Sequence, residues 1–393
     1  MLGSIYVGMS GLVAHAKGLQ TISHNVANLN SPGYKAARPR FADLHLGVPL
    51  ASTGPGVGTG GGVRFASSTI DYNQGGVQAS SGQLDLAVQG RGFIPVSTDT
   101  GVAYMRTGQF TADDTGHLIE RNTGAKLLGW SEAGGLMPVS ISGRVSSPPQ
   151  ETSSLVFGDN LSSGANEFSV PNVDIFDAAG TKHTVTIQFK PDNQIFPGRW
   201  AVTVLDADDR ALGGASLQFL GGIPEIGMDV LDVELALPGG ASHTVSLDFS
   251  QCVTNFSAGS YSSLRVRQSD GHGHGEISSM RITQTGHLEL AYANGQTQTL
   301  DAIALAVFND PQQLEQAGQG LFRAAAGAPA RYAPASDASA GRLLSGSTEA
   351  SNVDLSGEFG RLILMQRGFQ ASSQVVSTAN EMIMQLFQMR GQG

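Results

Sequence analysis

The chain is poor in cysteine, in charged residues and in aromatic residues. Its single cysteine, Cys252, excludes an internal disulfide and a cysteine-rich metal site. Charged residues make up 14% and aromatic residues 7% of the 393 residues, whereas glycine occurs 52 times, which is typical of a polar chain with many turns. The formal net charge of −10 argues against a nucleic-acid partner, because a protein that binds phosphates needs a basic face.

Long apolar runs are missing as well. No segment reaches the roughly 18 uninterrupted apolar residues that would span a membrane, so we expect no membrane insertion. The first residues carry no charged leader before their apolar part, and Ser10, His15 and several glycines interrupt that part. We therefore expect no cleaved signal peptide, and a chain that leaves the cytoplasm would need another export route.

Motifs that carry catalytic chemistry are also absent. The sequence has no His-Glu-x-x-His, no Gly-x-Ser-x-Gly and no Gly-Lys-Ser/Thr phosphate loop. The loop 271–275 contains His272 and His274, but two ligands fall short of the three or four of a stable metal site, and a solvated hinge is the favoured interpretation. We predict no catalytic, cofactor-binding or metal-binding residues and no enzyme activity; an enzyme built on this loop and nearby acids is a weak alternative.

Both ends of the chain have the apolar spacing of helices. Steps of three and four residues predict helices over 1–34 and 353–393, the second starting near Gly357 with Ser356 as its N-cap. Glycines in the first helix should weaken it by about 1 kcal/mol each. The predicted contact residues are Leu2, Ile5, Met9, Leu12, Leu19, Ile22 and Val26 in the first helix and Leu362, Met365, Phe369, Val376, Ile383 and Leu386 in the second.

The sequence between the helices alternates like β-strands with frequent turns. It predicts an extended connector at 35–83, a middle β-domain made of 84–145 and 282–333, an inserted β-domain at 146–281, and a second connector at 334–352. The inserted domain should be a sandwich or barrel. The fold class is therefore multidomain α+β, with coiled-coil-like terminal helices that pack together and mainly β domains between them.

Terminal helices of this kind are suited to self-assembly. Pairing the two stripes with each other would leave apolar residues uncovered, among them Ile22, Val26, Ile363, Phe387 and Met389. An exposed apolar patch marks an assembly surface. We therefore predict a polymer subunit whose main partner is a second copy of the chain.

Several motifs then resemble a known family. The run Asn25-Val26-Ala27-Asn28-Leu29-Asn30-Ser31-Pro32-Gly33-Tyr34-Lys35 resembles the N-terminal signature of bacterial flagellar rod and hook proteins. Its residues Asn25, Asn28, Asn30, Pro32, Gly33, Tyr34 and Lys35 form the motif and its turn, with Gly33 at the position that needs positive φ. Residues 84–93 and 294–297 resemble further family blocks, and residues 352–356, 358–359, 366–370 and 379–382 resemble the C-terminal signature, with Phe369 where a tyrosine is common and Gln374 where a lysine is common.

The resemblance implies a function and a set of partners. The inserted domain favours a subunit of the flagellar hook, the flexible tube that transmits torque, over the alternative of a distal rod protein. The terminal helices would form the inner core of the tube. Expected partners are other copies of the chain, the hook cap protein, the distal rod protein, the hook–filament junction protein and the flagellar type III export apparatus. The expected location is the extracellular part of the flagellum, joined to the basal body.

Overall fold

The computed structural model describes residues 2–45, 60–131, 135–192, 196–237, 242–325, 327–335, 337 and 339–390. The chain divides into two compact units. The first contains Met1–Ser142, Met280–Glu289 and Thr299–Gly393, and the second contains Gly143–Ser279 and Leu290–Gln298. Neither helix in the described ranges is long and apolar enough to cross a membrane. The multidomain α+β fold class predicted from the sequence is confirmed.

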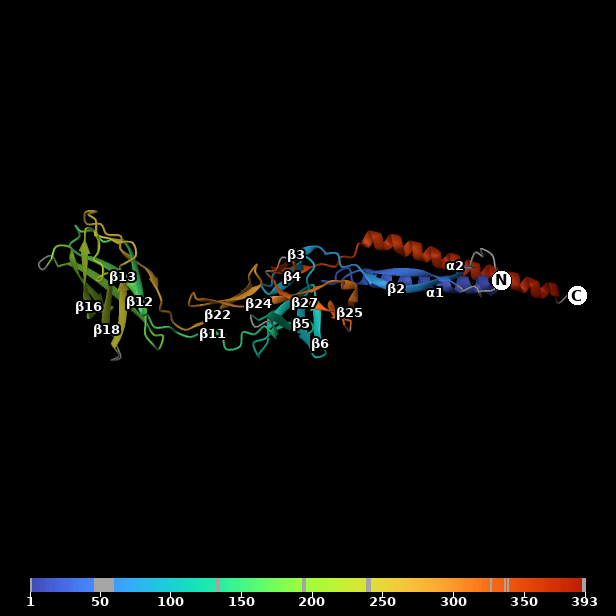
Figure 1. The fold of residues 1–393 in the computed structure, drawn as a ribbon, viewed down its shortest axis with the longest axis horizontal. Helices are drawn as coiled ribbons and strands as arrows, with labels where there is room; N and C mark the ends of the chain where they lie inside the picture. Colours follow the sequence, from blue (N-terminus) through green and yellow to red (C-terminus); the bar gives the residue numbers. More distant parts are fainter. Residues whose placement is uncertain are drawn as a thin grey trace. The chain divides into compact units, whose positions relative to one another are not determined.

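Two long helices form one part of the first unit (Figure 1). Helix α1 covers Leu2–Ala27, and helix α2 covers Leu355–Arg390. They pack side by side and antiparallel, because Gly8 lies against Val376 while Gly18 lies against Met365. The predicted start of α2 is wrong by two residues: Asp354 precedes the helix, its Oδ1 accepts from Ser356 N and its carbonyl accepts from Glu358 N. A carboxylate at this position satisfies free N–H groups of the first turn.

A β-hairpin replaces much of the connector expected at 35–83. Strands β1 (Ala37–His45) and β2 (Gly60–Ile70) pair antiparallel, with Ala37 opposite Ile70. The hairpin packs along α1, where Val63 N donates to Ser10 Oγ (3.1 Å), and Phe41 and Phe65 meet edge to face. The sequence alternates here in the way that a half-buried strand pair requires. The glycine-rich stretch at 46–59 lies outside the described residues.

The middle β-domain of the first unit joins two distant parts of the chain, as predicted. Its main sheet runs in the order β24-β9-β5-β6-β26-β25. Phe93, Tyr104, Phe308 and Phe322 form an aromatic core between these parts. The first part contains β4 (Asp85–Gln89), β5 (Ile94–Thr98), β6 (Gly101–Met105), β7 (Thr107–Ala112), β8 (Leu118–Glu120), β9 (Lys126–Trp130) and β10 (Leu136–Pro138). The second part contains β24 (Thr297–Phe308), the 3-10 helix η1 (Pro311–Gln313), β25 (Leu314–Gly318), β26 (Leu321–Ala324) and β27 (Ala330–Pro334).

The second expected connector, 334–352, also contains strands. Strand β28 (Arg342–Ser345) pairs with β4, and β29 (Ser347–Glu349) pairs with β3 (Val77–Ala79). Ala340 and Leu343 are buried. The apolar residues of this segment thus complete the β-domain, so that the chain reaches α2 along a fixed path.

The second unit is a sandwich of two five-stranded sheets, as predicted for the inserted domain. One sheet contains β13 (Phe168–Phe176), β14 (Lys182–Pro191), β15 (Arg199–Leu205), β16 (Ala211–Leu220) and β17 (Ile223–Pro224). The other contains β12 (Ser154–Asn160), β18 (Val230–Ala236), β19 (Ser242–Asp248), β20 (Val253–Thr254) and β21 (Arg265–Ser269). Phe157, Phe189 and Phe249 pack together in its core.

The second unit also includes residues 290–298, which the sequence places in the middle domain. Strands β22 (Gly275–Ile282), β23 (His287–Tyr292) and β24 each contain residues of both units, and the short β11 (Ser146–Ser147) pairs with β22. Asn294 Nδ2 donates to Gly273 O (2.9 Å), which holds the turn after β23 against the 271–275 loop. The predicted range 146–281 therefore omits this turn.

Candidate assembly surface and the junction of the chain ends

Small residues of α1 make the contact with α2. Gly8, Gly11, Ala14 and Gly18 are all buried along one face of the helix. A Cβ at Gly11 would lie 2.5 Å from Ser372 Oγ, and a Cβ at Gly8 would lie 2.7 Å from Val376 Cγ2. The glycines therefore let the two helix axes approach closely. The sequence interpretation, in which they only weaken the helix, misses this role.

Apart from Ile22, the predicted contact residues of α1 lie beside this buried face rather than in it. Ile22 is fully buried, which corrects the expectation that it stays uncovered. Half-buried positions are Ile5, Leu12, Leu19 and Val26. Met9 is exposed, and the side chain of Leu2 lies outside the described part of the chain. The glycines of α1 leave room for Val376 and Met365 of α2, so most of the larger α1 side chains flank the contact.

The predicted residues of α2 are placed in two groups. Leu362, Met365, Val376 and Ile383 are half-buried on the side that also carries the buried Ala379. Phe369 and Leu386 are exposed, although their spacing fits the same stripe. Whether the predicted residues form the contacts between subunits stays a prediction.

Many large apolar side chains of the helix pair are exposed in the described part of the chain. We call these residues together the exposed helix face. Its members are Tyr6, Val7, Met9 and Val13 of α1 and Leu355, Phe359, Ile363, Leu364, Phe369, Val375, Met382, Met384, Leu386, Phe387 and Met389 of α2. Side chains of this size usually lie inside a protein, so their number on one helix pair indicates an interaction site.

The signature motif ties the end of α1 to the start of β1. Asn25 is buried; its Nδ2 donates to Ala37 O (2.7 Å), and its Oδ1 accepts from Ala37 N (2.9 Å). The Tyr34 hydroxyl also donates to Asn25 Oδ1 (3.0 Å). A side-chain amide in this arrangement replaces a pair of backbone hydrogen bonds. Asn25 therefore sets the angle at which the chain leaves the helix.

The rest of the motif forms the turn that the sequence predicts. Asn28 Nδ2 donates to His24 O (2.9 Å), which closes the end of the helix. Gly33 has a φ of 69°, and its N–H donates to Glu349 O (2.7 Å). Asn30 and Pro32 are exposed and line a cleft of about 730 Å³ between this turn and the β25–β26 turn.

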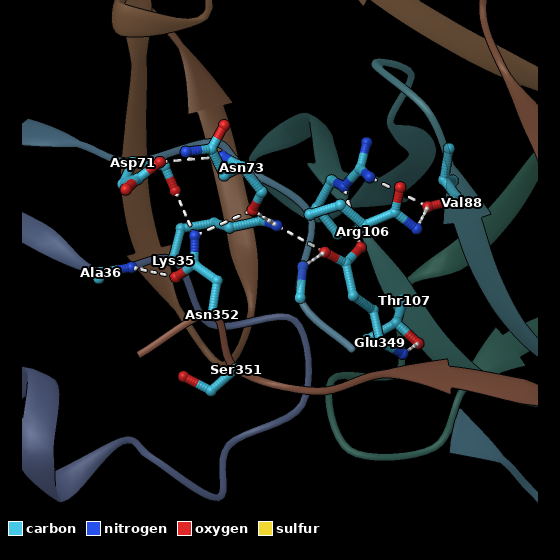
Figure 2. A network of polar contacts seen from close by, with 12 residues as sticks. Lys35, Ala36, Asp71, Asn73, Val88, Arg106, Thr107, Glu349, Ser351 and Asn352 are labelled. Carbon is cyan, nitrogen blue, oxygen red and sulfur yellow. Dashed lines mark hydrogen bonds and ion pairs between the residues drawn. The ribbon is translucent and has the colours of Figure 1, made fainter. Parts of the chain in front are cut away.

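Lys35, the last motif residue, belongs to a buried charge network (Figure 2). Lys35 Nζ lies 2.5 Å from Glu349 Oε1, and Arg106 Nε lies 3.1 Å from Glu349 Oε2. The side chains of Lys35 and Glu349 are 0% exposed and that of Arg106 is 2% exposed. Lys35 Nζ also donates to Asn73 O (2.8 Å), and Gly75 N donates to Glu349 Oε1 (2.8 Å). One carboxylate thus holds two cations that water does not reach.

Asn352 completes this junction on the C-terminal side. Its Oδ1 accepts from Ala36 N (2.8 Å), and its Nδ2 donates to the carbonyls of Asp71 (2.7 Å) and Asn73 (2.9 Å), as Figure 2 shows. The segments that leave α1 and enter α2 are therefore bound to each other and to the β-domain. The sequence interpretation names Lys35 but misses Glu349 and Arg106, which no local motif marks.

Burial governs the charges of the junction. Burial lowers the pKa of Lys35, and the neighbouring Glu349 opposes this shift. Burial also lowers the pKa of Arg106, again against the attraction of Glu349. The desolvation of both cations therefore makes the junction depend on the single carboxylate.

Burial, helped by the nearby Glu358 carboxylate, raises the pKa of Tyr34 to about 12. A raised folded-state pKa means that the neutral phenol favours folding. We expect this contribution to be complete below pH 10, the ordinary tyrosine value, and to be lost as the pH rises from there to about 12. The difference between the phenolate absorbance titrations of the wild type and Tyr34→Phe should have its midpoint near pH 12. A midpoint near 10 would contradict the burial of the phenol.

The histidine loop at 271–275 is partly packed: Gly275 is buried, His272 is half-buried and His274 is exposed. A Cβ at Gly275 would lie 2.5 Å from Asn294 Cγ, and the position of Gly271 is crowded by Thr152. His272 Nδ1 and Asn294 Nδ2 lie 3.2 Å apart. The exposure of His274 agrees with a solvated loop, and the hinge role stays a prediction. Within the described ranges, no three His, Cys, Asp or Glu side chains converge to hold a metal ion.

Comparisons with known proteins agree with the motifs. The family model "Flagella basal body rod protein" matches residues 5–35, and "Flagellar basal body rod FlgEFG protein C-terminal" matches residues 344–389. The flagellar hook protein of Borreliella burgdorferi is 27% identical and aligns over 99% of this chain and 100% of its own. The hook proteins of Salmonella typhimurium and Escherichia coli are 29% and 28% identical, over 97% of this chain and 98% of theirs.

A solved structure is also similar to part of the chain. The flagellar hook protein FlgE2 of Helicobacter pylori covers 68% of this chain and 98% of its own, with a TM-score of 0.49 and 12% identity. This likeness is too weak to add to the sequence relationships.

Proposed function

We infer that the chain, which belongs to the family of bacterial flagellar rod and hook proteins, is a subunit of the flagellar hook. The observation that carries this function is the end-to-end match to several hook proteins, which leaves little of either chain unaligned. The exposed helix face supplies a surface for assembly with copies of itself. The alternative of a distal rod protein gains no further support.

In the layered tube that we propose, α1 and α2 form the inner core. The helix pair is the part of the first unit with the most exposed large apolar side chains, and burying them between copies would gain roughly 25 cal/mol per Å². The middle β-domain would form the next layer, and the second unit would face outward. The network of Lys35, Glu349 and Arg106 would fix the inner core to the middle layer.

The finer partners and the location also belong to this proposal. We propose contacts with the hook cap protein, the distal rod protein and the hook–filament junction protein, and export through the flagellar type III apparatus. The subunit would act outside the cell without a cleaved signal peptide, as a structural protein and not as an enzyme. The weak helix formers in α1 support export in an unfolded state, because such a helix gains its stability from packing.

Charge on the helix pair should abolish assembly. Leu362 and Ile383 are half-buried on α2, so Leu362→Asp or Ile383→Asp would place a carboxylate against apolar neighbours in the inner core. We expect no hooks by electron microscopy of cells that produce either variant as their only copy. Unfolding of the β-domains should remain unchanged, because these positions lie outside them.

Gln374→Asp is the matched control. Gln374 lies on the same helix and is exposed, so this variant adds the same charge without burying it. It should assemble hooks as the wild type does. Normal hooks from Leu362→Asp and Ile383→Asp would contradict the proposed inner core.

A further inference from the structure

Helix α2 extends past the beginning of α1. The two helices have 36 and 26 residues, and the contact of Gly8 with Val376 sets their alignment. At this alignment the last turns of α2 lie beyond residue 1, as the red end of α2 does in Figure 1. Phe387 is 69% exposed and Met389 is 74% exposed. We call this apolar end, residues 384–390, the α2 overhang.

An apolar groove lies between α1 and the β1–β2 hairpin. It has a volume of about 330 Å³ and is lined by Tyr6, Met9 and Val13 of α1 and by Leu44, Val63 and Phe65 of the hairpin. Tyr6 is 55% exposed and Val13 is 59% exposed, although both are large apolar side chains. Lys17 and Arg64 also line the groove, whose described lining residues include no acidic side chain; Asp43 lies opposite Val63 in the hairpin.

We propose that the α2 overhang of one subunit docks in this groove of a second copy. The proposal rests on the proposed function and specifies one of its contacts. Both surfaces are rich in apolar side chains that remain exposed in the described part of the chain. The free carbonyl groups at the end of a helix carry partial negative charge, which suits Lys17 and Arg64.

The overhang cannot reach the groove of its own chain. Gly11, which lies at the level of the groove, contacts Ser372, fifteen residues before Phe387. At a rise of 1.5 Å per residue these levels are about 20 Å apart along the helix. A parallel second copy would therefore be displaced by about this distance along the helix axis. Such a contact joins two different surfaces and propagates from copy to copy, which produces an open polymer.

Disulfide formation between copies tests the contact. In a Cys252→Ser background, which removes the single native cysteine, Val13→Cys and Phe387→Cys are introduced into the same chain. Hooks isolated from cells that make only this variant should give a ladder of oligomers on a non-reducing gel. Hooks made of copies with only Phe387→Cys should give only the monomer band on this gel. Tyr6→Cys with Met389→Cys is a second pair, used if the first variant does not assemble.

Ser373→Cys with Phe387→Cys is the matched control. Ser373 is exposed at the same level as the groove but lies on α2, so this pair should not form the ladder. Assembled hooks without a ladder from either groove pair, or with an equal ladder from the control, would overturn the docking contact and leave the hook function intact. Failure of the unmodified chain to restore hooks would instead overturn the proposed function.

Discussion

Replacing Glu349 with alanine is expected to destabilise the first unit by about 3–5 kcal/mol, the cost of leaving a buried charge without its partner. Both carboxylate oxygens of Glu349 are occupied, by Lys35 and Gly75 on one side and by Arg106 on the other. Alanine would leave two buried cations without a counter-ion. The backbone hydrogen bonds of residue 349 would remain, so the loss reports the side chain alone.

The two tryptophans allow this effect to be measured in one unit. Trp130 lies in the first unit and Trp200 in the second, so a Trp200→Phe background leaves Trp130 as the only tryptophan. Urea unfolding followed by its fluorescence should show the predicted loss for Glu349→Ala. Arg281→Ala is the control, because its exposed ion pair with Glu289 should contribute only about 0.2–1 kcal/mol. Equal urea midpoints for Glu349→Ala and Arg281→Ala would contradict the proposal that Glu349 stabilises the first unit.

A further variant separates charge from shape. Changing Lys35 and Arg106 to methionine together with Glu349→Leu removes all three charges while filling similar volume. Replacement of a buried ion network by apolar side chains is often neutral or stabilising. We therefore expect this triple variant to recover most of the stability that Glu349→Ala loses. Recovery would show that the single substitution acts through uncompensated charge.

The sequence was sufficient for the parts of the fold that depend on local patterns. Spacing of apolar residues predicts both helices and the half-buried positions Leu362, Met365 and Val376. The turn at Gly33 follows from a residue that tolerates positive φ. Alternating strands separated by turns predict the sandwich of the second unit and the discontinuous middle domain.

The remaining features depend on contacts that a local pattern does not contain. Lys35 and Glu349 are 314 residues apart in the sequence, so their ion pair appears only in the folded chain. The contact face of α1 consists of glycines and Ala14, small residues that a search for large apolar side chains does not find. That search instead finds Met9, which lies beside the contact. The helices and the contact residues Met365 and Val376 of α2 were therefore predictable, but the side of α1 that meets them was not.

Replacing Gly11 with leucine is expected to separate α1 from α2 and to prevent hook assembly. The new Cβ alone would lie 2.5 Å from Ser372 Oγ and 3.2 Å from Ser372 Cβ, and the longer side chain would meet more of α2. Overpacking of this kind typically costs about 1–3 kcal/mol. Because leucine favours a helix more than glycine does, any loss must come from the contact and not from helix propensity.

Gly360→Ala is the matched control for this experiment. Gly360 also lies in a helix, but a Cβ there would have no atom within 4 Å. This variant should stabilise α2 by about 1 kcal/mol and should still assemble hooks. Electron microscopy of cells that produce each variant shows whether hooks assemble. Trp130 fluorescence of the purified variants, in the Trp200→Phe background, shows whether the β-domain remains folded. Normal hooks from Gly11→Leu would mean that close approach of α1 and α2 is not needed in the polymer. Loss of hooks only in Gly11→Leu would establish that the glycines are retained for packing, at the expense of the stability of the isolated helix.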